Sequence, residues 1–189
     1  MLLFAAWTLI VRLGLSDLVS NPLDHTIRAA HSAWLLRLDR VLALPGTPVL
    51  SAAVVLVICA ATAQHNPWRA AGILAAFAVG LLIEAALKQW LFYPSTGSYP
   101  SGHALRALFL AGVSAPVVKR RSLRLGLFAL ALAVGVSRVS VGDHYSDEVI
   151  GAWLLGWSLA VVALARLLPG PAAALPPAPA SDRETAATR

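Results

Sequence analysis

Long apolar stretches separated by short polar segments dominate this 189-residue chain. Six of them are long enough, or nearly long enough, to cross a hydrocarbon core of about 30 Å. They cover residues 2–15, 47–64, 70–92, 103–118, 124–141 and 148–168. The pattern therefore predicts an all-α fold, a polytopic membrane helix bundle with about six transmembrane helices.

The segments outside these stretches predict how the chain is organised. The first stretch is short and contains Arg12, so a signal-peptide core is the competing interpretation, but no basic segment or clear small-residue cleavage site accompanies it. Residues 16–46 mix charged and apolar residues at helical spacing, which indicates an interfacial segment. Residues 169–189 are rich in Pro and Ala and are expected to be a disordered tail, after a membrane domain at 1–168.

Composition supports a membrane protein and argues against a nucleic-acid-binding one. Hydrophobic residues make up 58% of the chain, and the mean hydropathy is +0.73. The net charge of +6 comes from short basic clusters between apolar runs, not from one basic face, so no nucleic-acid partner is expected. The single cysteine, Cys59, lies in an apolar stretch and excludes an internal disulfide framework.

Lysine and arginine in the short loops predict the orientation in the membrane. The basic cluster at 118–124 is expected in the cytoplasm, with the loop at 65–69 and both termini. The loops at 93–102 and 142–147 lack Lys and Arg and would lie outside, in a bacterial inner membrane by default. Residues 16–46 would also lie outside, although three arginines there conflict with this orientation. They are Arg28, Arg37 and Arg40.

Four polar side chains stand at ends of apolar stretches on this predicted outer side. Lys88 closes the third stretch, His103 opens the fourth, Arg138 lies near the end of the fifth, and His144 precedes the sixth. Ionisable groups are costly at membrane depth and often mark functional sites. Lys88 and Arg138 taken alone are equally explained as anchors that reach the interface.

A Pro-Ser-Gly-His turn precedes the fourth stretch. Ser101 offers a hydroxyl, Gly102 allows a ligand to approach the backbone, and His103 can transfer a proton at a helix start that suits a phosphate. By itself the turn is also an ordinary cap, and it needs partners elsewhere. After His144, either Asp147 or Glu148 could lie on the same helical face and orient its imidazole.

These residues resemble the motifs of the type 2 phosphatidic acid phosphatase, or PAP2, superfamily, whose core is shared with vanadium haloperoxidases. The second motif, Pro-Ser-Gly-His, is intact at residues 100–103. The third motif is Ser-Arg, five residues, His, three residues, Asp. It is matched from Ser137 and Arg138 to His144, with Glu148 in place of the Asp. The spacing favours Glu148 as the partner of His144, whereas residue type favours Asp147.

The first motif is degenerate. Lys88 is present, but Ser95 stands where the family has arginine. Arg106, one helical turn after His103, is the candidate for the missing charge, from spacing alone. Glu84 fits no motif and is expected to pair inside the bundle.

The resemblance implies a phosphatase that uses neither a metal nor another cofactor. His144 would form a phosphohistidine, Glu148 would orient it, and His103 would protonate the leaving oxygen. The residues implied to bind phosphate oxygens are Lys88, Ser101, Gly102 and Arg138, with Arg106 added by spacing. The substrate would be a phospholipid phosphate or a polyprenyl pyrophosphate in the bilayer. A lipid phosphotransferase and a weakly active lipid-phosphate-binding protein are the alternatives, and the oligomeric state is left open.

Overall fold

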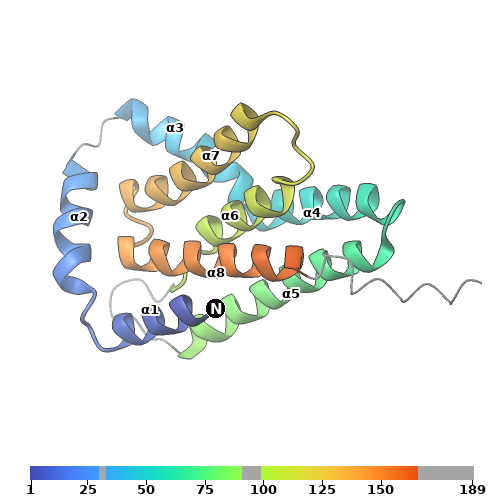
Figure 1. Ribbon diagram of the computed structural model, residues 1–189. Coiled ribbons are helices and arrows are strands. Elements are labelled where there is room, and N and C mark those ends of the chain that lie inside the picture. The colour runs from blue at the N-terminus through green and yellow to red at the C-terminus, as the bar shows by residue number, and fades with distance from the viewer. Residues whose placement is uncertain (30–32, 91–98, 166–189) are drawn as a thin grey trace, which may run out of the picture.

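The computed structural model describes residues 1–29, 33–90 and 99–165, and over these residues it is built from helices (Figure 1). The elements are α1 (Leu2–Arg12), α2 (Asp17–Ala29), α3 (Ala33–Ala43), the 3-10 turn η1 (Leu44–Gly46), α4 (Pro48–Ala63), α5 (Pro67–Trp90), α6 (Gly102–Ser114), α7 (Arg121–Ser140) and α8 (Ser146–Ala165). Each of the six apolar stretches contains one helix, so the predicted helix bundle is confirmed. The predicted tail at 169–189 lies outside the described residues.

Within the described residues, three helices are long and apolar enough to cross a membrane unaided, namely α5, α7 and α8. The number rises to five if two bent pairs are each one span: α1 with α2, bent by 89°, and Arg37–Gly46 with α4, bent by 44°. The helix of the fourth predicted stretch, α6, has 13 residues and is about 20 Å long, less than a hydrocarbon core. It can be short because protein, not lipid, surrounds it.

Helix α6 is the centre of the bundle. Residues 104–113 are all buried. Small residues bring α6 and α8 close together: a β-carbon added at Gly112 would lie 2.5 Å from Cβ of Ala160, and one added at Gly156 would lie 2.5 Å from the Leu105 carbonyl oxygen. Lipid tails are as apolar as the helices, so close packing of small residues, not the hydrophobic effect, must hold this pair together.

The outside of the bundle is apolar. Large hydrophobic side chains are exposed on α1, α4, α5, α7 and α8; examples are Leu2, Val57, Leu82, Leu125 and Val161. Such a continuous apolar exterior would be unusual on a water-soluble protein. These side chains are placed to contact lipid.

Helix α2 stands across one end of the bundle, at the left of Figure 1, and packs against α7 and α8. Its polar residues Ser20 and Asp24 are buried, whereas Leu18, Val19 and Leu23 are exposed. The segment is amphipathic, as its sequence predicts, with its polar face turned toward the protein. An inward polar face indicates that α2 covers a polar region of the bundle.

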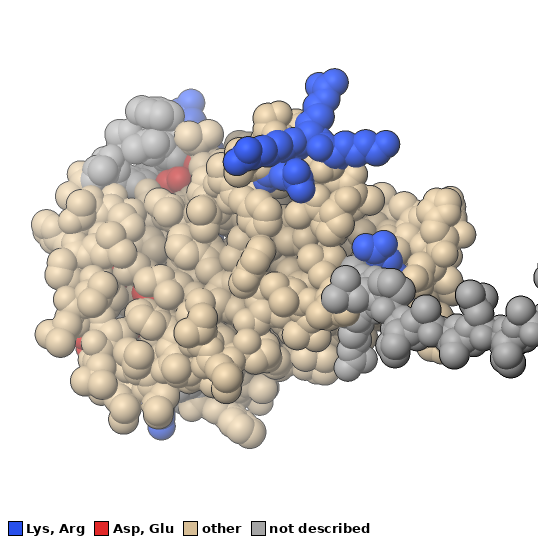
Figure 2. Space-filling model, viewed as in Figure 1, with Lys and Arg blue, Asp and Glu red and all other residues tan. Residues whose placement is uncertain are grey.

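The two ends of the bundle differ in charge. Figure 2 shows basic side chains gathered over the α6–α7 connection, where Lys119, Arg120, Arg121 and Arg124 are exposed. Helix α2 and the α7–α8 connection lie at the opposite end (Figure 1). The α7–α8 connection, which carries the third motif, is therefore at the end of the bundle opposite the basic cluster (Figure 1).

Candidate active site

The start of α6 presents the second motif. Ser101 is the N-cap residue, with an extended backbone, and its amide donates a hydrogen bond to the Glu148 carbonyl oxygen at 3.2 Å. Its hydroxyl does not cap α6; it is buried and has no hydrogen-bond partner among the described residues. An N-cap hydroxyl left over from capping, beside the N–H groups of a helix start, can bind an anionic oxygen.

Gly102 provides the room for the charged side chain behind this turn. A β-carbon at Gly102 would collide with Glu84 Oε1 and would lie 2.8 Å from an Arg106 guanidinium nitrogen. The glycine is therefore required because the Glu84 carboxylate packs directly against the backbone. From the sequence, glycine is expected at position 102 so that a ligand can approach the backbone. The structure adds a second reason, which is the close contact with Glu84.

Substituting Gly102 with alanine is expected to displace Glu84, lower the free energy of unfolding by about 1–3 kcal/mol, and reduce activity. Thermal unfolding in detergent and phosphate release measure the two effects. Gly72→Ala is the matched control, because no atom lies within 4 Å of a β-carbon at this helical glycine. Wild-type stability and activity in the Gly102→Ala protein would contradict the packing argument.

Glu84 joins two of the predicted phosphate-binding cations. Its Oε1 accepts a hydrogen bond from Lys88 Nζ and its Oε2 accepts one from an Arg106 guanidinium nitrogen, each at 2.6 Å. Arg106 Nε also donates to the Gly46 carbonyl oxygen at 2.8 Å. Glu84 thus pairs inside the bundle, as expected. Two cations and one carboxylate leave one net positive charge at the start of α6.

The third motif forms around the start of α8. His144 is buried, and its Nδ1 lies 2.8 Å from Glu148 Oε2. The same carboxylate oxygen accepts a hydrogen bond from the Tyr145 amide at 3.1 Å, and Glu148 is fully buried. A carboxylate that accepts the Nδ1 proton fixes the tautomer in which Nε2 carries the lone pair. Nε2 can then act as a nucleophile.

Asp147, the alternative partner of His144, has different contacts. Its Oδ2 accepts a hydrogen bond from the Ser16 hydroxyl at 2.9 Å, and its Oδ1 accepts one from the Glu148 amide at 2.8 Å. Its backbone carbonyl accepts a hydrogen bond from Trp7 Nε1. Asp147 therefore ties α8 to the N-terminal segment, whereas the carboxylate that contacts the histidine belongs to Glu148.

Arg138 holds the loop that carries His144. The backbone amide of His144 donates to the Arg138 carbonyl oxygen at 3.1 Å. The guanidinium donates to Asp143 Oδ2 and to the Asp39 carbonyl oxygen, each at 3.1 Å. The side chain of Arg138 is largely buried, so its charge sits close beneath the loop. It is positioned to act on an anion beside His144.

His103 lies where the two motifs meet. It is partly exposed, and the charged side chains close enough to influence it are Arg106, Arg138, His144 and Glu84. A β-carbon at Gly46 would lie 2.5 Å from the His103 carbonyl oxygen, so η1 packs directly against this residue. The fold thus brings residues 41 positions apart in the chain, His103 and His144, into one charged site.

Two residues near the site have no place in the motifs. Glu84 could have been found as a lone carboxylate on an apolar helix, one turn before Lys88. Arg28 donates to the His144 carbonyl oxygen at 3.2 Å from a helix more than one hundred positions away. The only feature of the sequence that drew attention to Arg28 was its place on the predicted outer side, where arginine is disfavoured. Ser95, at the degenerate position, lies outside the described residues.

Comparison with known proteins shows which family part of this chain resembles. The sequence model of the PAP2 superfamily matches residues 83–168. Phosphatidylglycerophosphatase B of Bacillus subtilis strain 168 is 28% identical over 111 residues, which cover 49% of this chain and 55% of that protein. The match therefore spans little more than half of the curated relative.

Two solved structures share the fold. The PAP2-type phosphatidylglycerolphosphate phosphatase from Bacillus subtilis superposes with a TM-score of 0.73 at 21% identity, covering 87% of this chain and 92% of its own. Aquifex aeolicus LpxE superposes with a TM-score of 0.65 at 17% identity, covering 78% and 95%. This is an integral membrane protein, and its residues 83–168, which carry the motif residues of the candidate site, match the sequence model of the PAP2 superfamily.

Proposed function

We propose that this protein is a membrane phosphatase that hydrolyses a phospholipid phosphate at the outer interface of a bacterial inner membrane. The observation that carries the proposal is the contact between His144 Nδ1 and the buried Glu148 carboxylate, beside the start of α6. That contact prepares Nε2 for attack, and the neighbouring N–H groups and cations suit phosphate oxygens. The name of the Bacillus subtilis relative supports a phosphatidylglycerol phosphate as the substrate.

The proposed reaction has two steps. His144 Nε2 attacks phosphorus, the bond from phosphorus to the lipid oxygen breaks, and His103 gives its proton to that oxygen. Water then attacks the phosphohistidine, His103 takes a proton from the water, and inorganic phosphate leaves with His144 restored. Lys88, Arg138, the Ser101 hydroxyl and the amide of Gly102 stabilise the phosphoryl oxygens, and Arg106 adds charge from behind.

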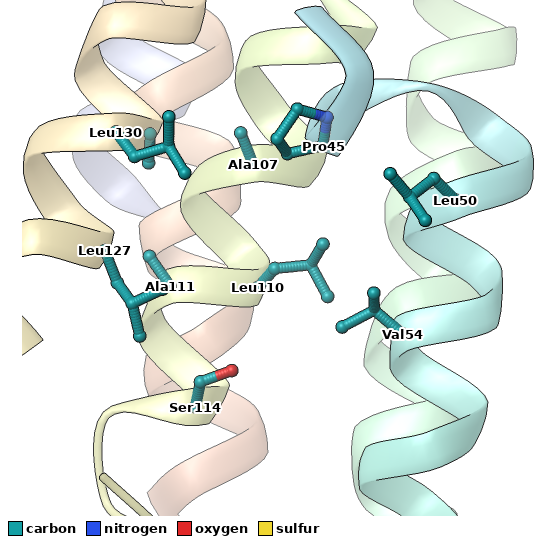
Figure 3. Close-up of a pocket in the computed structure, with 10 residues that line it drawn as sticks. Pro45, Leu50, Val54, Ala107, Leu110, Ala111, Ser114, Leu127 and Leu130 are labelled. Atoms are coloured by element: carbon teal, nitrogen blue, oxygen red, sulfur yellow. The ribbon is translucent and has the colours of Figure 1, made fainter. Parts of the chain in front are cut away.

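An apolar groove near the site offers a place for a lipid tail. It has a volume of about 260 Å³ and runs between α4, α6 and α7 (Figure 3). One end is formed by Pro45, next to the Gly46 carbonyl that holds Arg106, and Ser114 lies toward the other end. A lipid could therefore keep a tail in this groove while its phosphate is held near His103.

Phosphate release by the purified protein in detergent tests the proposal. With EDTA present, we expect the wild-type protein to release phosphate from phosphatidylglycerol phosphate, phosphatidic acid or both, and the His144→Ala protein to release none. A polyprenyl pyrophosphate with the same detergent tests the alternative substrate class. EDTA also tests the expectation that no metal is needed.

Three results would count against the proposal in different ways. Absence of release from every lipid phosphate would leave a lipid-phosphate-binding protein. Release that depends on a second lipid as acceptor would indicate a phosphotransferase. Loss of release with EDTA, restored by a divalent cation, would contradict the metal-independent mechanism.

A further inference from the structure

A polar cavity lies where α2 crosses the start of α8. It has a volume of about 380 Å³, and we call it the α2 cavity. The residues that line it are Asn21, Asp24, His25, Arg28, Ala29 and Tyr145. Tyr145 directly follows His144, so the cavity adjoins the proposed nucleophile. Its polar lining contrasts with the apolar lipid-tail groove between α4, α6 and α7.

Arg28 is fixed in this cavity by uncharged groups. One terminal nitrogen donates to the His144 carbonyl oxygen at 3.2 Å, and the guanidinium carbon lies 4.9 Å from the centre of the Tyr145 ring. Within residues 1–29, 33–90 and 99–165, no carboxylate lies at ion-pair distance from Arg28, and its buried Nε has no hydrogen-bond partner. A guanidinium held in this way retains donors and a full charge for an anion.

Asp24 supplies acceptors one turn away on the same face of α2. It is 4% exposed, and its Oδ1 accepts a hydrogen bond from the Ser146 amide at 2.9 Å. Its Oδ2 is also buried and has no partner in the described part of the chain. Asp24 lines the cavity, an unsatisfied buried carboxylate oxygen is costly, and a ligand hydroxyl that reaches Oδ2 would satisfy it. Asn21 lies one turn before Asp24 and adds an amide.

We infer that the α2 cavity binds the headgroup of the substrate, a glycerol-type alcohol with a second phosphate, and this rests on the proposed function. The headgroup hydroxyl donates to Asp24 Oδ2, and the second, diester phosphate accepts from Arg28. Phosphatidic acid cannot make these contacts, because its phosphate is joined directly to diacylglycerol. A polyprenyl pyrophosphate has no hydroxyl for Asp24. The cavity therefore selects lipids whose scissile phosphate is carried on a hydroxylated, anionic headgroup.

This assignment also explains why an arginine lies on the predicted outer side. The preference for Lys and Arg in cytoplasmic loops disfavours Arg28 at this place. Binding of an anionic headgroup would offset that preference and explain Arg28 on the outer side. Arg37, on α3, is exposed and outside the cavity, and it provides a matched control.

The test compares kcat/KM for phosphatidylglycerol phosphate and phosphatidic acid with identical acyl chains. Arg28→Gln is expected to lower kcat/KM for phosphatidylglycerol phosphate by about 10-fold or more, and that for phosphatidic acid by less than about 3-fold. Asp24→Asn keeps an oxygen for the Ser146 amide and should shift the ratio in the same direction. Arg28→Lys should recover part of the loss, and Arg37→Gln should change neither value.

Equal losses for both lipids, or no loss for either, would overturn the headgroup assignment. Binding separates this failure from failure of the proposed function. Phosphatidylglycerol phosphate is titrated into the His144→Ala protein, with tryptophan fluorescence as the readout, with and without Arg28→Gln. Weaker binding with Arg28→Gln supports the assignment even if the wild-type protein hydrolyses no lipid. Unchanged binding overturns it whatever the activity.

Discussion

The His144→Ala protein is expected to lose phosphate release by about 10⁴-fold, and the Glu148→Gln protein by about 10²-fold or more. Removing the imidazole removes the nucleophile. Replacing the Glu148 carboxylate with a neutral amide leaves the imidazole in place but weakens the hydrogen bond to Nδ1, which now spans 2.8 Å between Nδ1 and Oε2, and removes the charge that stabilises a positive imidazole. Rapid quenching with labelled substrate should trap an acid-labile phosphoprotein in the wild type and none in the His144→Ala protein.

Asp147→Asn is the control for this pair. Asp147 lies next to Glu148 in the sequence and is equally buried, yet its oxygens accept hydrogen bonds from Ser16 and from the Glu148 amide. We therefore expect Asp147→Asn to lower activity less than Glu148→Gln does. The reverse order would mean that the contact between His144 and Glu148 is not the one used in catalysis. A phosphoprotein in the His144→Ala protein would exclude His144 as the nucleophile.

Arg106→Met is expected to lower both stability and phosphate affinity. Glu84 would remain buried and keep Lys88 but lose Arg106, which costs up to about 3–5 kcal/mol of unfolding free energy, the loss typical of a fully unpaired buried charge. The start of α6 would also lose a positive charge. Thermal unfolding in detergent gives the first effect, and KM for a lipid phosphate gives the second.

The double variant Glu84→Gln with Arg106→Met separates the two roles. Neutralising the carboxylate removes the buried charge that Lys88 alone would balance in the single variant, so we expect stability to recover while KM stays high. Recovery of both would show that Arg106 only balances Glu84, and that the charge lost from the first motif is supplied elsewhere. If the Arg106→Met protein keeps both wild-type stability and wild-type KM, Arg106 neither balances Glu84 nor contributes to phosphate binding.

Local sequence spacing was enough to predict that a carboxylate lies beside the imidazole of His144. His144 and Glu148 are four residues apart at a helix start, and helical geometry alone puts them on one face. Ser101 and His103 are two residues apart at the start of the other motif helix, α6, so local sequence also places them close together. The choice between Asp147 and Glu148 required the structure, because helical geometry admits both positions, while motif spacing favours Glu148 and residue type favours Asp147. In the structure, Glu148 contacts the imidazole, and Asp147 accepts a hydrogen bond from Ser16, which is 131 residues away.

The charge network could not be predicted from local spacing. The ion pair between Arg106 and Glu84 joins residues 22 positions apart on two helices. The hydrogen bond from Arg138 to the Asp39 carbonyl oxygen joins residues 99 positions apart. Both depend on which helices become neighbours. The length of α6 was overestimated for a related reason. Apolar sequence continues to residue 118, but the helix ends at Ser114, two residues before Pro116. This short length is tolerated because a helix enclosed by protein need not match the thickness of a bilayer.

The seam between α6 and α8 limits how this sequence can vary. The two histidine motifs begin these two helices, and Gly112 and Gly156 set how closely the helices approach. A larger residue at either glycine would push α6 and α8 apart. It would thereby change the separation of His103 and His144 although the substituted residue itself does not contact the site. Lipid-facing positions such as Leu125 and Val161 carry no such constraint. Among homologues that keep both histidine motifs, we therefore expect the positions of Gly112 and Gly156 to keep small residues. Lipid-facing positions are expected to exchange one apolar residue for another without this restriction.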